Sequence, residues 1–396
     1  MRVLQIAPYF DPYTGGQERY IFSLSKHLVK LGHDVDVVTS RFPRGSERRQ
    51  SIEGFRVYRY RCAARPLRNP ITPGLLALLP DLSNYDIIHA HNEYSFGALA
   101  GSFFRSCSGV PLVLTSHIFR LFYGNPFKDR MVSMYTKLVC PKILESADAI
   151  FANSLDDKMH LSSLSPKSRH KIKLVSNAVE PERFKIQAAN GIRPDIAELI
   201  ADDKKRLLFV GNLLRRKGVD VLIKAVSNMT AQRDDIRLLV VGDGIDRDYF
   251  ENIANETNAR KNIVFLGKVS QSDLVHLYHN STLFVLPSFG ELCPTTVLEA
   301  QCCGLPVVTT DTPGIADHFS DTAALVPPGD VEALQEVILS LLADESIGEG
   351  LAQKAVRNIR ATYNWDNIAE QYSDAYLSIL NETTSQNNTA RYTSAY

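Results

Sequence analysis

The feature that most constrains the fold is an alternation, along the whole chain, of short apolar runs and longer segments with helical periodicity. This alternation is typical of parallel α/β units, in which a helix connects each strand to the next. In the first half we predict a helix at Glu18–Leu31 and strands at Val3–Ala7, Val35–Thr39, Phe55–Tyr60, Ile87–Ala90, Leu112–Thr115, Ala149–Ala152 and Lys173–Val175. In the second half we predict a helix at Val219–Asn228 and strands at Arg206–Val210, Leu238–Val241, Ile263–Leu266, Leu283–Leu286, Val307–Thr309 and Ala324–Val326.

This pattern predicts an α/β protein with two Rossmann-like domains, one over residues 1–182 and the other over residues 206–363. The polar stretch 177–205 lacks a strand pattern and is the expected hinge. Residues 364–380 predict an amphipathic helix that closes the chain, and residues 381–396 predict a disordered tail. Open parallel sheets bind ligands at the carboxyl ends of their strands, so the cleft between two facing sheets is the expected site.

Composition excludes several classes of protein. The chain has 396 residues, is 44% hydrophobic and carries 44 basic against 44 acidic residues, which excludes disorder as the dominant state. Its six cysteines form neither a paired framework nor a CxxC metal site, so we interpret them as reduced thiols. The N-terminus lacks the longer apolar segment of a signal peptide, and no apolar run approaches the roughly 18 residues of a membrane span. We expect a cytoplasmic protein, at most peripheral to a membrane.

A glycine pair near the N-terminus is a candidate phosphate site. Gly15 and Gly16 follow the first predicted strand and precede a helix. Glycine lets bare backbone amides approach a phosphate, and the helix N-terminus adds positive potential. An ordinary glycine-rich turn is the alternative interpretation.

A cluster of cations in the second half is a more specific signal. The segment VGNLLRRKG follows a strand and precedes a helix, and it contains Asn212, Arg216 and Lys217. Such a cluster suits a diphosphate, because Arg provides forked hydrogen bonds and Lys a point charge. A solvated run of charges is the alternative, although it does not explain the flanking glycines.

The most specific element is the segment LPSFGELCPTTVLEAQCCGLP at residues 286–306. Glu291 lies in a predicted loop and Glu299 in the helix that follows. Thr295 and Thr296 lie near the start of that helix, where free N–H groups can hold a phosphate. Paired acids often indicate glycoside hydrolysis, but the phosphate-binding surroundings favour a nucleotide-linked sugar, with Glu299 at the ribose and Glu291 at the sugar hydroxyls.

Three histidines lie at the ends of predicted strands on the expected cleft side. His89 and His91 form an H-x-H pair, but no further ligand lies nearby in sequence, so we expect no metal site. His89 is interpreted as structural. His117 precedes the aromatic segment IFRLFYGNPF and is the better candidate for contact with reacting groups.

A strongly basic stretch covers residues 41–68, where nine arginines accompany two acids. It includes the predicted strand FRVYRY, whose arginines, Arg56 and Arg59 with the adjacent Arg61, are expected to share one face. This face can attract anionic lipid or a phosphorylated acceptor, and a solvated rim is an equally good interpretation. No nucleic-acid-binding module accompanies it, so nucleic acid is not an expected partner.

Taken together, these elements resemble the retaining glycosyltransferases of family 4, the glycosyl transferase group 1 superfamily. The resemblance covers nearly the whole chain and includes, in order, the Gly-Gly loop, DIIHAHNE, VLTSH, ADAIFANS, KIKLVSNAVEPERF, VGNLLRRKGVDVLIKA, LVVGDG, NIVFLGKV, the two glutamates seven residues apart, GLPVVTTDTPGI and LVPPGD. The resemblance implies a GT-B fold, in which two Rossmann-like domains face each other across a cleft and the C-terminal helix crosses back to the first. It also implies transfer of a sugar from a nucleotide diphosphate donor with retained anomeric configuration, without a metal.

The resemblance implies a role for each matched residue. Backbone amides at Gly16 meet the donor phosphate, and Lys217 neutralises the diphosphate leaving group. Glu299 holds the ribose, Glu291 positions the donor sugar and His117 contacts the reacting sugar or the acceptor. These roles agree with the physical requirement that leaving-group charge be stabilised while water is excluded.

Two departures from the family pattern bear on the donor site. Asn212 stands where the family usually has Arg, and Arg215 or Arg216 can compensate. The usual E-G-F-G reads Glu291-Leu292-Cys293-Pro294 here, which removes an amide contact at position 294. The other residues expected to contact the donor are Leu292, Cys293, Thr295 and Thr296.

We therefore expect a hexosyltransferase that uses a UDP- or GDP-sugar as co-substrate, needs no cofactor, and acts on a glycolipid or cell-surface glycan. Tyr123 joins the arginines as an expected contact to the acceptor or to an anionic membrane surface. Two alternatives stay open. A sugar-nucleotide 2-epimerase of the same fold would isomerise the donor without an acceptor, and a non-catalytic subunit would bind the nucleotide sugar only.

Overall fold

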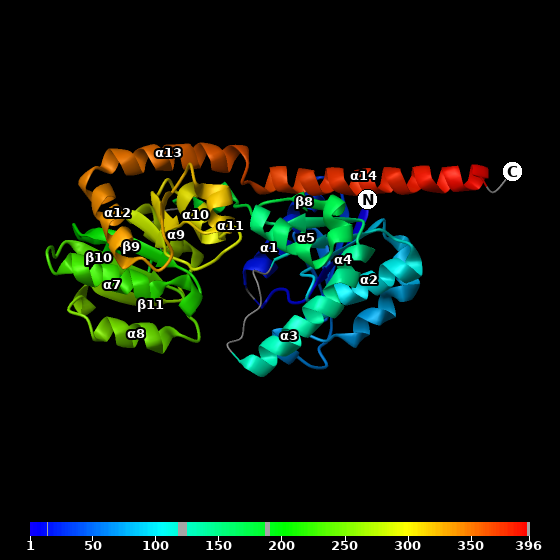
Figure 1. Cartoon of the computed structure of the whole chain (residues 1–396), viewed down its shortest axis with the longest axis horizontal. Coiled ribbons are helices and arrows are strands. Elements are labelled where there is room, and N and C mark those ends of the chain that lie inside the picture. The colour runs from blue at the N-terminus through cyan, green and yellow to red at the C-terminus, as the bar shows by residue number, and fades with distance from the viewer. Residues whose placement is uncertain (14, 118–124, 187–190, 394–396) are drawn as a thin grey trace. The chain divides into compact units, whose positions relative to one another are not determined.

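The computed structural model describes residues 1–13, 15–117, 125–186 and 191–393, with side chains described as far as residue 383. The chain forms two compact units (Figure 1). The N-terminal unit comprises Met1–Asn177 together with Trp365–Tyr396, and the C-terminal unit comprises Ala178–Asn364. The last helix therefore belongs to the first unit, although it follows the second in sequence.

The N-terminal unit is built on an eight-stranded sheet with the strand order β3-β4-β2-β1-β5-β6-β7-β8. Its strands are β1 (Arg2–Ala7), β2 (Asp34–Arg41), β3 (Arg49–Ile52), β4 (Phe55–Arg61), β5 (Ile87–His91), β6 (Leu112–Thr115), β7 (Ala149–Ala152) and β8 (Ile172–Leu174). Its α-helices are α1 (Gly16–Lys30), α2 (Phe96–Ser108), α3 (Pro126–Leu138), α4 (Cys140–Ser146), α5 (Leu155–Leu164) and α14 (Trp365–Thr393). Central strands such as β5 and β6 are buried along their whole length, as expected of a parallel sheet covered on both faces.

The C-terminal unit is built on a six-stranded parallel sheet with the order β11-β10-β9-β12-β13-β14. Its strands are β9 (Lys205–Val210), β10 (Ile236–Val241), β11 (Ile263–Gly267), β12 (Leu283–Leu286), β13 (Val307–Thr310) and β14 (Ala324–Val326). Its α-helices are α6 (Pro194–Ala201), α7 (Val219–Thr230), α8 (Arg247–Asn255), α9 (Gln271–His279), α10 (Thr295–Cys302), α11 (Pro313–Phe319), α12 (Val331–Ala343) and α13 (Glu345–Ala361). The apolar runs found in the sequence form these strands and one continuous core around them.

One strand was not predicted. Strand β3 has the sequence RQSI, which carries neither an apolar run nor a clear alternation. It pairs antiparallel with β4 through a tight turn in which both Glu53 and Gly54 have positive φ. Turn geometry and edge pairing, rather than burial, therefore form this strand.

Apart from its first residue, Asn177, the expected hinge is part of the C-terminal unit. Residues 178–186 and 191–205 include α6, whose N-cap Arg193 donates its backbone N–H to Asp273 at 2.9 Å. Near the start of the expected hinge, Val179 donates its N–H to the carbonyl of Tyr363 at 3.0 Å.

Helix α14 is anchored in the N-terminal unit by a buried hydrogen-bond network. The hydroxyl of Tyr372 lies 2.8 Å from the hydroxyls of both Tyr20 and Thr115, and the hydroxyl of Tyr376 lies 2.7 Å from Nδ1 of His89. The helix continues to Thr393, where we expected a disordered tail from residue 381. Starting a helix is costly, but each residue added to an existing helix gains one hydrogen bond for the one residue that is ordered. A polar sequence can therefore extend a helix that is already formed.

Within the described residues, no helix is both long enough and apolar enough to cross a bilayer.

Candidate functional site

Two cations and one carboxylate meet in the C-terminal unit. Lys217 ends the short 3-10 helix Arg215–Lys217 after β9, and Glu291 lies in the loop after β12. Oε1 of Glu291 lies 2.7 Å from Nζ of Lys217 and 2.5 Å from Nη1 of Arg216. The side chains of Lys217 and Glu291 are only 11% and 13% exposed, so this ion pair is largely shielded from water.

The protonation state of Glu291 follows from these contacts. Burial alone would raise the pKa of its carboxyl group, but the charges and hydrogen bonds of Lys217 and Arg216 outweigh burial and lower the pKa below its ordinary value. Glu291 is therefore ionised at neutral pH. A second anion bound at this cluster would share Lys217 and Arg216 with Glu291.

The neighbouring Arg215 has different partners. Its guanidinium pairs with Asp246 at 3.6 Å and lies over the ring of Tyr249 at 3.8 Å. Of the two arginines proposed to compensate for Asn212, Arg216 is therefore the one that the structure places beside Lys217.

Close backbone packing positions this loop. A Cβ on Gly314, the second residue of α11, would overlap the carbonyl oxygen of Glu291. A Cβ on Gly218, which has φ +68°, would overlap the carbonyl oxygen of Pro287. Glycine at both positions thus lets the segments that carry Lys217 and Glu291 approach their neighbours.

Helix α10 presents the other expected donor contacts. Thr295 is its first residue, and the first intrahelical hydrogen bond runs from the N–H of Val297 to the carbonyl of Pro294 at 3.1 Å. The N–H groups of Thr295 and Thr296 precede that bond and are positioned as anion donors. Leu292 and Cys293, by contrast, are buried and pack into the core.

Glu299 lies one turn inside α10 and is buried. Its Oε2 accepts a hydrogen bond of 2.9 Å from the hydroxyl of Tyr278, on α9. Sequence analysis did not identify Tyr278, because a tyrosine in an apolar helical pattern gives no signal beyond core packing.

In the N-terminal unit the glycine pair forms the start of α1. Gly15 is the N-cap of this helix, and a Cβ there would overlap Oε2 of Glu18. A Cβ on Gly16 would meet no other atom within 4 Å. Burial raises the pKa of Glu18 to about 7, so the acid is half-protonated near neutral pH. An acid in the first turn of α1, packed against Gly15 of the expected phosphate loop, was not part of the prediction.

His117 forms one end of a hydrogen-bonded chain. Gln5 Oε1 lies 2.6 Å from Nε2 of His91, and Nδ1 of His91 lies 2.9 Å from Nε2 of His117. Because the amide oxygen of Gln5 can only accept, His91 carries its proton on Nε2. Nδ1 of His91 is then an acceptor, so His117 donates from its own Nε2. Burial lowers the pKa of His117 to about 3. The ring is therefore neutral, and its unprotonated Nδ1 is an acceptor for a hydroxyl group.

His89, interpreted as structural, lies in the buried network under α14. Its Nε2 lies 2.8 Å from Oγ1 of Thr115, and burial lowers its pKa well below the ordinary value. Tyr20 joins this network to the candidate site, because its ring packs edge-on against the ring of His117 with centroids 4.8 Å apart. Within the described residues, no group of three His, Cys, Asp or Glu side chains is arranged to hold a metal.

The expectation that the arginines of FRVYRY share one face is wrong. Arg56 is ion-paired with Asp34 at 2.8 Å and Asp36 at 2.5 Å. Arg59 is 5% exposed and donates to the carbonyls of Asp11 and Glu47. The cause is strand alternation, since residues an odd number of positions apart point to opposite faces.

Two further residues, Arg61 and Tyr123, were expected to contact the acceptor or a membrane surface. Arg61 ends β4 and is exposed. Tyr123 lies outside the described residues.

Comparison with known proteins agrees with this architecture. Residues 14–183 match the family model Glycosyltransferase Family 4, and residues 194–362 match the model Glycosyl transferases group 1. The D-inositol 3-phosphate glycosyltransferase of Corynebacterium glutamicum is 28% identical, with 95% of this chain and 96% of that protein covered. A phosphatidylinositol N-acetylglucosaminyltransferase subunit from Homo sapiens is 24% identical, with 94% of this chain and 75% of that protein covered.

Solved structures share the fold. Sucrose-phosphate synthase from Thermosynechococcus elongatus matches with a TM-score of 0.80 at 24% identity, covering 96% of this chain and 99% of that one. The Anabaena protein HepE, solved in complex with UDP-glucose, matches with a TM-score of 0.74 at 16% identity, covering 96% of this chain and 100% of that one. The two parallel-sheet units define a protein of the GT-B class.

The two family models, one for each unit, identify the protein further. The chain belongs to the group 1 glycosyltransferases and is a glycosyltransferase enzyme. The expected fold and family are thus confirmed.

Proposed function

We propose that the protein is a retaining hexosyltransferase that moves a sugar from a UDP- or GDP-linked donor to a lipid-linked or glycan acceptor at the cytoplasmic face of a membrane. The observation that carries this proposal is the cluster of Lys217, Arg216 and Glu291. It combines two cations suited to a diphosphate with a buried, ionised carboxylate that can accept sugar hydroxyls.

Departure of a nucleoside diphosphate places negative charge on its β-phosphate. Lys217 and Arg216 are held in place before the donor binds, so they can stabilise this charge without reorganising. As the diphosphate draws on these cations, Glu291 becomes available to accept hydrogen bonds from the donor sugar. Glu299, oriented by Tyr278, offers its carboxylate to the ribose diol.

His117 acts as a neutral group in this proposal. Its unprotonated Nδ1 can accept a hydrogen bond from a hydroxyl of the reacting sugar or of the acceptor, and its low pKa keeps it in this state across the physiological range. The chain Gln5–His91–His117 fixes the tautomer. No step in this account requires a metal or another cofactor.

Similarity to other proteins supports the choice of donor and acceptor. The fold neighbour HepE was solved with UDP-glucose, which favours a UDP-sugar. The names of two relatives specify inositol 3-phosphate and phosphatidylinositol, which favours an acceptor that carries phosphate.

The first test is a thermal-shift screen of the purified protein against UDP, GDP, ADP, their sugar conjugates and NAD. A ligand at about 100 times its dissociation constant stabilises a protein by roughly 2.7 kcal/mol, which gives a shift of several degrees. We expect stabilisation by one nucleoside diphosphate, lost in Glu299→Ala and Lys217→Ala and kept in the control Lys224→Ala, an exposed residue of α7.

The donor so identified is then incubated with candidate acceptors, and the anomeric configuration of the product is read by NMR. Retention supports the proposal and inversion contradicts its mechanism. Isomerisation of the donor without transfer would indicate a 2-epimerase. Binding without isomerisation, hydrolysis or transfer would indicate a non-catalytic subunit.

A further inference from the structure

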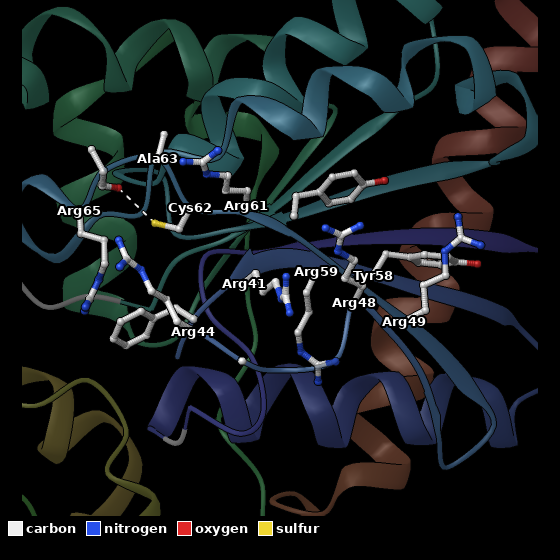
Figure 2. A pocket seen from close by; sticks show the side chains of 14 residues that line it. Arg41, Arg44, Arg48, Arg49, Tyr58, Arg59, Arg61, Cys62, Ala63 and Arg65 are labelled. Atoms are coloured by element: carbon white, nitrogen blue, oxygen red, sulfur yellow. Dashed lines mark hydrogen bonds between the residues drawn. The ribbon is translucent and has the colours of Figure 1, made fainter.

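A large pocket in the N-terminal unit is lined by arginines. It has a volume of about 1030 Å³ and lies between the end of β2, the loop leading to β3, and the end of β4 with the loop that follows it (Figure 2). Seven of the fourteen residues that line it are arginines, and none is an acid. This volume is at the upper end of the range for ligand pockets, about 300–1,000 Å³.

Six of these arginines form no ion pair with any carboxylate in the described part of the chain: Arg41, Arg44, Arg48, Arg49, Arg61 and Arg65. Elsewhere in the same sheet, Arg2 and Arg56 are paired with Asp34 and Asp36. Arginines without counter-ions in one concave site repel one another. A bound anion would remove this repulsion.

The pocket has a preformed wall. The guanidinium of Arg65 lies 3.6 Å from the centroid of the Phe42 ring and donates to the Tyr9 hydroxyl at 2.9 Å. Nε of Arg41 donates to the carbonyl of Ser46 at 2.8 Å, and Arg49 lies over the ring of Tyr58. These contacts orient the guanidinium groups while leaving donors on each for a ligand.

Arg59 joins the pocket to the rest of the N-terminal unit. It is buried, and it donates to the carbonyl of Asp11 at 2.7 Å, to that of Glu47 at 3.2 Å and to Oε1 of Gln50 at 3.0 Å. Burial lowers its pKa, and the charges of Asp11 and Glu47 act in the opposite direction. Arg59 thus supports the pocket, and the exposed arginines around it are the ones available to a ligand.

The position of the pocket relates it to the reaction. Arg41 and Arg61 end parallel strands, as His91 ends β5, so the pocket and the His91–His117 pair lie along the same edge of this sheet. Asp11, whose carbonyl accepts a hydrogen bond from Arg59, belongs to the β1–α1 loop that continues to Gly15. A ligand in the pocket therefore lies next to the β1–α1 loop, at the edge of the sheet that also carries His91 and His117.

We propose that this arginine pocket binds a group with clustered phosphates, a diphosphate or several phosphomonoesters, as the anionic part of the acceptor. The paired N–H donors of a guanidinium group match phosphate oxygens in geometry and in charge. The volume of the pocket is large enough for more than one phosphate. This inference rests on the proposed function for its link to the acceptor. The binding of a polyphosphate itself does not depend on that function.

The test uses the full chain with inositol hexakisphosphate as probe, measured by isothermal titration calorimetry with UDP at saturation to fill the donor site. The variant Arg44→Ala/Arg48→Ala/Arg61→Ala removes three exposed pocket arginines. The matched control, Arg169→Ala/Arg183→Ala/Arg357→Ala, removes three exposed arginines outside the pocket and changes net charge equally. All six side chains are at the surface, so both variants are expected to fold, which their melting temperatures check.

We expect wild-type protein to bind the probe, the pocket variant to bind at least tenfold more weakly, and the control to stay within twofold of wild type. Equal weakening in both variants, or no binding by wild type, overturns the proposal. UDP binding by wild type, followed by thermal shift, is an independent readout of the donor site. If UDP binds and the probe does not, the pocket inference fails and the proposed function stands.

Vesicles distinguish the source of the phosphate. Pocket-dependent binding to vesicles with phosphorylated inositol lipid, but not to phosphatidylserine vesicles of equal charge, identifies a lipid headgroup. Binding of the soluble probe alone identifies a free phosphorylated acceptor. Equal binding to both kinds of vesicle, lost in the pocket variant, would indicate a general contact with anionic membranes and would overturn the proposal.

Discussion

Lys217 and Glu291 form an ion pair of 2.7 Å although they come from loops that follow two different strands, β9 and β12. These strands are neighbours in the sheet, so their carboxyl ends bring the two loops together. The pair is largely shielded from water, and Arg216 completes it. The proposed donor site thus contains its own internal anion, which a bound diphosphate would partly replace.

Replacing Lys217 by Ala is expected to lower kcat/KM for sugar transfer at least 100-fold, which corresponds to about 3 kcal/mol of transition-state stabilisation. The physical reason is loss of the shielded cation next to the leaving group. Steady-state kinetics with the identified donor measure the effect, and Lys224→Ala is the control. Unchanged kcat/KM in Lys217→Ala would show that Arg216 alone neutralises the leaving group.

Gly314→Ala is expected to lower activity strongly and to lower the melting temperature, because its Cβ would overlap the Glu291 carbonyl and displace that loop. The matched substitution is Gly350→Ala in α13, where no atom lies within 4 Å of the new Cβ. This control is expected to stabilise the helix by up to about 1 kcal/mol. Thermal unfolding and transfer assays of both variants provide the comparison. Equal melting temperatures would contradict the packing argument.

Glu18→Gln is expected to stabilise the protein above pH 7 by up to about 3 kcal/mol and to have little effect near pH 4. Burial raises the pKa of Glu18 from 4.5 to about 7, so its ionisation costs more in the folded than in the unfolded chain. Wild-type stability therefore falls as the pH rises from 4.5 to 7, and the glutamine variant avoids this fall. Urea unfolding at pH 4.5, 6 and 8 measures the difference. A constant difference across these values would contradict the assigned pKa.

Tyr372→Phe is expected to cost about 1–3 kcal/mol of stability, because the buried hydroxyls of Tyr20 and Thr115 lose a partner. The control is Tyr135→Phe in the same unit, whose hydroxyl has no hydrogen-bond partner among the described residues. Denaturant unfolding of both variants tests the anchoring of α14. A similar cost for the two substitutions would contradict the network.

Tyr278→Phe is expected to weaken nucleotide binding several-fold while leaving the fold intact. The hydroxyl donates to Oε2 of Glu299 at 2.9 Å, and its loss removes one of the contacts that orient the carboxylate. Titration with the nucleoside diphosphate measures the change. Affinity equal to wild type would indicate that helix α10 alone orients Glu299.

Sequence patterns sufficed for the strands whose side chains are buried on both faces. β6 (LVLT) is almost wholly apolar and β5 (IIHAH) is apolar apart from its two histidines, because a helix-covered parallel strand admits few polar side chains. The edge strand β3 lacks this constraint and was not predicted. The arginines of β4 were assigned to one face, although their alternation along the strand already separates Arg56 from Arg59.

The sequence by itself determined the fold class and the family, and it predicted which loops carry the chemistry, since these follow from local periodicity and from motifs read along the chain. Only the tertiary structure decided which charges meet. That Arg216 rather than Arg215 joins Lys217 at Glu291, that His91 sets the tautomer of His117, and that Tyr278 orients Glu299 depend on the packing of separate segments. The reason is physical: a hydrogen bond requires its two heavy atoms within about 3 Å and an ion pair within about 4 Å, and strand order and loop packing set such distances.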